Sequence, residues 1–165
     1  MSVESTLAKV AAELRANQHR QARLRLRGLL SSHPTDLALR RRFADAYQRI
    51  QHPEQAGRWN YLDESLSFWE LGAFEQCFRD PARRLALLFW PDPAHNPPPT
   101  RTARRRLAGL YWEATGTAPD WPEHRRDAAV RLRPEGRSPW EEDRALAELR
   151  ERLSRGPDSP APEAT

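Results

Sequence analysis

The sequence contains one helical pattern twice near its N-terminus, and this repeat constrains the fold more than any other feature. The first-helix pattern recurs at an offset of 33 residues, with Phe43 at the position of Val10. The second-helix pattern recurs at an offset of 34, with Ala56 at the position of Ala22, so the second copy needs a turn one residue longer. Apolar residues in each copy follow helical spacing. The repeat therefore predicts two antiparallel helical hairpins stacked side by side.

Two positions depart from the repeat. Arg40 stands where the first copy has Leu7, and Asn60 stands where it has Leu26. Polar side chains at positions that should be apolar leave the shape of the second hairpin open. An alternative interpretation is two ordinary amphipathic hairpins whose spacing agrees by chance. Both interpretations predict helices in this part of the chain.

The repeated pattern resembles the tetratricopeptide repeat. In that repeat, large apolar residues, Tyr and Ala recur at fixed positions and a proline ends the unit, which here is Pro34. In that family the outward-facing residues of each first helix line a concave groove that binds peptides. The resemblance places eight residues in such a groove: Ala8, Ala12, Arg15 and Ala16 from the first copy, and Arg41, Asp45, Gln48 and Arg49 from the second. Three of the four charged residues are basic, which implies a partner with an acidic segment or a C-terminal carboxylate.

Helical periodicity continues beyond the repeat, and no segment alternates convincingly as a strand would. Capping signals support several helix ends, such as Asp36, the Ser67-x2-Glu70 capping box and Gly116. The expected helices cover about 3–16, 19–31, 37–50, 53–62, 67–78, 80–90, 101–115 and 138–156. The predicted fold class is all-α: tetratricopeptide-like helical hairpins of about six helices, then a proline-rich linker and two further helices.

The distribution of prolines predicts the domain organisation. Five prolines within residues 91–100 favour an extended linker. The expected parts are therefore a tetratricopeptide-like helical domain at 1–90, the linker at 91–100, a C-terminal helical extension at 101–156 and a disordered tail at 157–165.

Charge and cysteine content bound the location and the class of protein. The net charge is +4, and charged residues throughout the first 30 positions exclude a secretory apolar region or a membrane span there. We therefore expect a cytoplasmic protein. The single cysteine, Cys77, lies between Phe74 and Phe78 and is interpreted as a small buried hydrophobic residue. Trp59, three residues after Ala56, is interpreted as a core residue.

Searches for catalytic and cofactor motifs give no support for an enzyme. The five histidines lack metal-ligand spacing, and there is no Gly-rich phosphate loop or nucleophile elbow. The segment Asp120–His124 gathers two carboxylates and an imidazole, but it lies in a proline-containing loop. We therefore expect no cofactor and no metal.

Two arginine triplets, Arg40–Arg42 and Arg104–Arg106, raise the question of nucleic-acid binding. Consecutive residues on a helix point about 100° apart, so each triplet fans out and is interpreted as a solvated face. Arginine-mediated nucleic-acid binding is kept as an alternative that the acidic residues disfavour.

The stretch from Pro34 to Glu64, most specifically Gln55-Ala56-Gly57-Arg58-Trp59-x-Tyr61-Leu62, resembles an uncharacterised family of small actinobacterial proteins with a domain of unknown function. The resemblance implies a bacterial, helical protein and no activity. The function that the sequence favours is a non-enzymatic helical-repeat module that binds a protein partner through Arg15, Arg41, Asp45, Gln48 and Arg49. A purely structural, self-associating helical domain is the other alternative.

Overall fold

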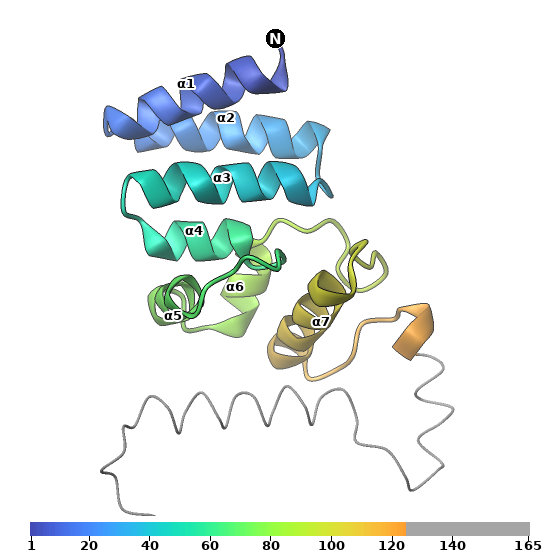
Figure 1. The fold of residues 1–165 in the computed structure, drawn as a ribbon. Coiled ribbons are helices and arrows are strands. Elements are labelled where there is room, and N and C mark those ends of the chain that lie inside the picture. Colours follow the sequence, from blue (N-terminus) through green and yellow to red (C-terminus); the bar gives the residue numbers. More distant parts are fainter. Residues whose placement is uncertain (125–165) are drawn as a thin grey trace, which may run out of the picture. The chain divides into compact units, whose positions relative to one another are not determined.

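The computed structural model describes residues 1–124, and no strand occurs in this part of the chain. Seven α-helices lie between Val3 and Thr115 (Figure 1). They are α1 (Val3–Arg15), α2 (His19–Ser32), α3 (Leu37–Arg49), α4 (Pro53–Asn60), α5 (Phe68–Cys77), α6 (Pro81–Leu87) and α7 (Arg101–Thr115). The all-α prediction is thus confirmed for this part. The expected helix at 138–156 and the tail at 157–165 lie outside the described residues.

The helices begin and end at the capping residues that the sequence indicates. The Asp36 carboxylate accepts a hydrogen bond from the Leu39 backbone N–H at 2.9 Å at the start of α3. Ser67 and Glu70 form a reciprocal capping box at the start of α5. Gly116 ends α7 with a left-handed φ of 75°, which a residue with a Cβ adopts less readily. Local sequence therefore determines where α3 and α5 begin and where α7 ends.

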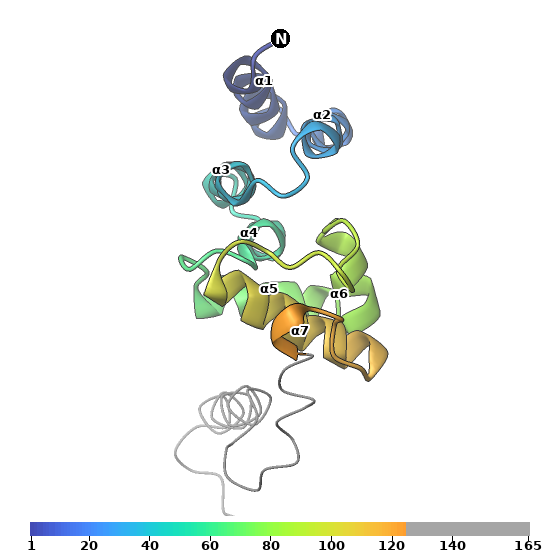
Figure 2. The same cartoon turned by 90° about the vertical axis from the view of Figure 1, so that its right-hand side faces the viewer.

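Helices α1 to α4 form a stack (Figure 1). α1 packs on α2 and α3 packs on α4, and α1 also contacts α3. Figure 2 shows α1 and α3 on one side of this stack and α2 and α4 on the other. The apolar faces meet in one continuous core, formed by Leu7, Val10, Leu14, Ala22, Leu26, Leu30, Leu39, Phe43, Ala44, Tyr47, Ala56 and Trp59. Trp59 is buried there, with its ring edge-to-face against Phe43 at 5.2 Å between centroids.

The two departures from the repeat are buried in the same way as the leucines they replace. Arg40 is only 2% exposed, and Asn60 is equally buried. The expectation that all three arginines of Arg40–Arg42 face outward is wrong for Arg40. Its guanidinium donates to main-chain carbonyls near the end of α6, and the Asn60 amide donates to the Glu70 carboxylate at 3.2 Å. Both positions meet polar groups of later segments, so the second hairpin buries polar side chains where the first buries leucine.

α4 and α5 approach closely at Gly57. A Cβ at this position would lie 2.2 Å from the main-chain oxygen of Glu70 and 3.0 Å from the Cβ of Phe74. Only glycine allows this separation, because both neighbours belong to the body of α5 rather than to a flexible side-chain end.

The proline-rich segment does not separate two units, contrary to the expected boundary at 91–100. One compact unit runs through it, from Met1 to Arg125. Pro98 is fully buried, and the Trp90 indole N–H donates to the Asn96 carbonyl at 2.7 Å. The buried Trp121 donates to the Pro93 carbonyl at 3.0 Å. Trp90 and Trp121, which precede and follow the segment in the chain, thus satisfy carbonyls of a segment that has few donors of its own.

Because the loop Asp120–His124 contains the buried Trp121, it has a packing role in addition to its polar residues.

Cys77 is exposed, so its assignment to the core is wrong. The buried side of α5 carries Glu70, Leu71 and Phe74, and Cys77 is the last residue of that helix.

None of the helices within residues 1–124 combines the length and the apolar character that a membrane crossing requires.

Candidate anion-binding site

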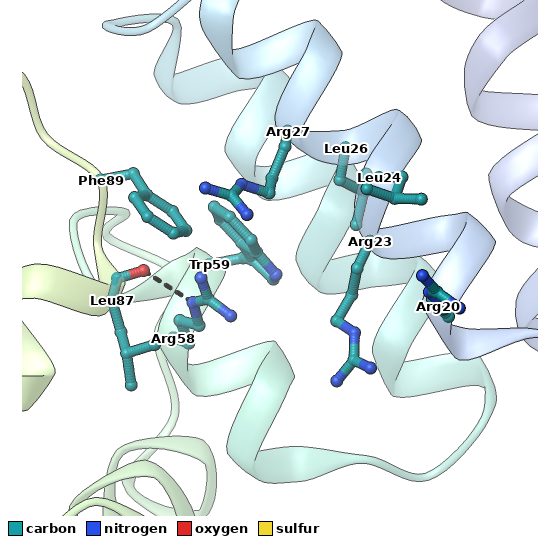
Figure 3. A pocket seen from close by; sticks show the side chains of 9 residues that line it. All are labelled: Arg20, Arg23, Leu24, Leu26, Arg27, Arg58, Trp59, Leu87 and Phe89. Carbon is teal, nitrogen blue, oxygen red and sulfur yellow. Dashed lines mark hydrogen bonds between the residues drawn. The ribbon is translucent and has the colours of Figure 1, made fainter.

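A pocket of about 310 Å³ lies on the side of the stack formed by α2 and α4. Figure 3 shows the side chains that line it, which come from α2, α4 and the C-terminal end of α6 with the residues after it. They are Arg20, Arg23, Leu24, Leu26, Arg27, Arg58, Trp59, Leu87 and Phe89. Four of the nine are arginine and none is acidic. This composition separates the pocket from an ordinary mixed surface.

Three of the arginines, Arg20, Arg23 and Arg27, lie along one face of α2. Their i, i+3, i+7 spacing places them on one stripe about 10 Å long. The stripe is exposed because the buried face of α2 carries leucine and alanine instead. Within the described residues none of the three lies within 4.0 Å of a carboxylate, whereas Arg25 on the same helix pairs with Glu13 at 2.6 Å. Their charges are therefore available to a bound anion.

Arg58 forms the wall opposite the arginine stripe and is 8% exposed. Its Nε donates to the Leu87 carbonyl at 2.7 Å, which fixes the side chain against the end of α6. The guanidinium lies 4.4 Å from the centroid of Trp59 and 5.1 Å from that of Phe89. Burial lowers the pKa of Arg58 to about 10, and the charges of Arg23 and Arg27 act in the same direction. Arg58 is thus a desolvated cation without a carboxylate partner among the described residues.

Phe89 forms the rim of the pocket next to the end of α6. Its φ of 48° lies in the left-handed region, which is uncommon for a bulky residue. Arg40 holds this backbone in place, because its Nη2 donates to the Phe89 carbonyl at 3.1 Å and to the Pro34 carbonyl at 2.9 Å. Arg27 lies 5.5 Å from the Phe89 ring centroid. The buried Arg40 therefore positions an aromatic ring among the arginines of the pocket.

Two of the apolar side chains that line the pocket, Leu24 and Phe89, are open to solvent. Leu24 is 60% exposed and Phe89 is 41% exposed, although both are large hydrophobic residues. Trp59 is 4% exposed, and its buried indole Nε1 has no hydrogen-bond acceptor among the described residues. Guanidinium groups bind carboxylates and phosphates through paired hydrogen bonds, and exposed apolar side chains favour an apolar contact. The pocket is thus suited to an anion carried on an apolar group.

The residues of the predicted groove do not line this pocket. They are exposed on α1 and α3, the side of the stack opposite to α2 and α4 (Figure 2): Arg15, Arg41, Asp45, Gln48 and Arg49. The Gln48 amide donates to the Glu70 carboxylate of α5, so it is already engaged. That these residues bind a peptide stays a prediction.

Sequence reasoning missed the pocket, although part of its signal is visible. The segment that forms α2 contains no acidic residue, and Arg20, Arg23 and Arg27 fall on one helical face. The other half could not be found in this way, because Arg58 and Phe89 lie about 30 and 60 residues further along the chain. No group of three or more metal-ligating side chains suitable for an ion occurs within residues 1–124.

Comparison with known proteins gives a family but no activity. The model of DUF6584, a family of unknown function, matches residues 1–148. The chain belongs to this family. The DUF6584 match covers the whole helical stack and all nine residues of the pocket. No curated protein and no solved structure matches the chain.

Proposed function

We propose that this protein is a non-enzymatic helical module that binds an acidic segment of a partner protein, and that the pocket between α2, α4 and the end of α6 receives this segment. The observation that supports the proposal most directly is the set of four pocket arginines without a carboxylate partner in the described part of the chain. A buried cation such as Arg58 is costly without a counter-charge, and a bound carboxylate would supply one.

The shape of the site favours a protein segment over a nucleic-acid duplex. The arginine stripe extends over about 10 Å and lies beside apolar side chains in a hollow, whereas a duplex needs phosphate contacts along an extended surface. The arginine triplets do not supply that surface. Arg40 is buried, Arg104 pairs with Glu123 at 3.1 Å, and Arg106 donates to the Tyr61 carbonyl at 3.2 Å.

The proposal retains the tetratricopeptide-like interpretation of the two hairpins, with one change in where the partner binds. Tetratricopeptide-like repeats would bind on the side of α1 and α3, but the arginine pocket lies on the side of α2 and α4. Cytoplasmic location and an actinobacterial source remain part of the proposal on the basis of the sequence.

Fluorescence anisotropy with the full chain tests the proposal. The probes are a fluorescein-labelled peptide of eight glutamates and a labelled DNA duplex of about 20 base pairs. Arg23→Gln and Arg27→Gln should each weaken peptide binding about tenfold, equivalent to about 1.4 kcal/mol, because each removes a charge-assisted contact. Arg41→Gln is the matched control, since it removes an exposed arginine from α3.

The outcomes separate the alternatives. Equal loss of binding for Arg41→Gln and the pocket variants would contradict binding of the peptide in the pocket. It would favour binding in the predicted groove or attraction by net charge alone. Tighter, more salt-dependent binding of the duplex would favour the nucleic-acid alternative. An absence of binding to either probe, together with a dimer in sedimentation, would favour a self-associating structural domain.

A further inference from the structure

Resting on the proposed function, we infer that the residue seated in the pocket is a phosphotyrosine of the partner segment. Charge favours a phosphate over one carboxylate at the same position. One carboxylate balances one of the four pocket arginines, whereas a doubly charged phosphate balances two. A phosphate monoester carries about −1.5 to −2 at pH 7 and presents three acceptor oxygens, which several guanidinium groups can share.

The pocket combines charged side chains with exposed apolar ones. Arg58 is buried against the Trp59 ring, while Arg20, Arg23 and Arg27 face the pocket from α2 (Figure 3). The exposed side chains of Leu24 and Phe89 belong to the same pocket. Phosphotyrosine offers both within one side chain, because its apolar ring carries the anion at its far end. Aspartate, glutamate and phosphoserine lack the ring.

Phe89 offers a contact surface to such a ring. Phe89 is 41% exposed, and the hydrogen bond from Arg40 to its carbonyl holds its backbone in place beside the pocket arginines, with a left-handed φ, before a ligand arrives. A tyrosine ring can pack against Phe89 and against guanidinium planes, as aromatic rings and arginine do in cation–π contacts. The pocket volume of about 310 Å³ is at the lower end of the range for small-ligand sites, about 300–1,000 Å³, and suits one side chain rather than a helix.

The test uses four peptides with the same acidic flanking residues and one central residue that is phosphotyrosine, tyrosine, phosphoserine or glutamate. Isothermal titration of the full chain should give binding of the phosphotyrosine peptide at least about tenfold tighter than binding of the other three. Arg27→Gln and Phe89→Leu should remove most of this preference, whereas Arg42→Gln, at an exposed arginine of α3 outside both the pocket and the predicted groove, should keep it. Circular dichroism melting of Phe89→Leu checks that this variant still folds. Arg27→Gln tests the contribution of the pocket to the preference at an exposed residue.

Each remaining outcome decides between the two proposals. If the glutamate and phosphotyrosine peptides bind equally, the acidic-segment proposal stands and the phosphotyrosine inference is overturned. Equal binding of the phosphoserine peptide would overturn it too, because the ring would then contribute nothing. If free phosphotyrosine binds as tightly as the peptide, the ligand is a free aromatic phosphate and the assignment to a protein partner falls. Binding of none of the peptides would overturn both proposals.

Discussion

Substitution of Gly57 by alanine tests the packing that places α4, and with it Arg58 and Trp59, against α5. The new Cβ would lie 2.2 Å from the Glu70 carbonyl oxygen and 2.8 Å from its carbon. Ordinary contact begins near 3.4 Å, so α5 must move by about 1 Å. Overpacking of this kind costs about 1–3 kcal/mol, and the better helix propensity of alanine offsets up to about 1 kcal/mol. We expect a net loss of about 1–2 kcal/mol in unfolding free energy.

Gly28→Ala is the matched control for this prediction. Gly28 lies inside α2, and a Cβ there meets nothing within 4 Å. Alanine should therefore stabilise the protein by up to about 1 kcal/mol. Urea unfolding followed by far-ultraviolet circular dichroism should separate the two variants by about 1–3 kcal/mol. A Gly57→Ala variant as stable as the wild type would show that α4 and α5 are not packed at this distance.

Three further predictions concern the buried groups around the pocket. Arg40→Met should lower the free energy of unfolding by about 3 kcal/mol in urea titrations, because buried carbonyls lose a charge-assisted donor; a change below 1 kcal/mol would contradict the role given to Arg40. Trp59→Ala should cost about 3–5 kcal/mol, and an unchanged melting temperature would contradict its burial. Acidic-peptide binding should weaken as the pH rises through about 10, since burial lowers the pKa of both Arg58 and Arg40 to about 10 and neutral arginines neither attract the anion nor hold Phe89 as firmly; affinity constant to pH 11 would contradict the contribution of these two buried arginines.

The sequence was sufficient for the helices because their signals are local. Capping residues such as Asp36 and the Ser67 capping box act within one turn, and helical periodicity separates buried from exposed faces. The burial of Arg40 could not be predicted in this way, since it depends on carbonyls that lie about 50 residues away in the chain. The same is true of the proline segment, which is held by Trp121 across the fold.

The candidate site shows the same division between local and distant signals. The arginine stripe of α2 is visible as a spacing within one helix, but its meaning depends on Arg58 and Phe89, which come from two other segments. Cys77 was misplaced for a related reason, because apolar neighbours in sequence do not identify which side of a helix end faces the core. A pattern of charges within one helix therefore indicates a site only when the fold brings residues of other segments, here Arg58 and Phe89, next to it.

The most direct test of the anion-binding pocket is a nuclear magnetic resonance titration of the full chain, observing the tryptophan indole N–H resonances as the octaglutamate peptide is added. Trp59 lines the pocket, whereas Trp69 and Trp112 lie elsewhere and are 75% and 49% exposed. The pocket account predicts a saturable shift of the Trp59 resonance that is lost in Arg23→Gln, with little change at Trp69 and Trp112. A saturable shift at Trp69 or Trp112 with none at Trp59 would contradict it.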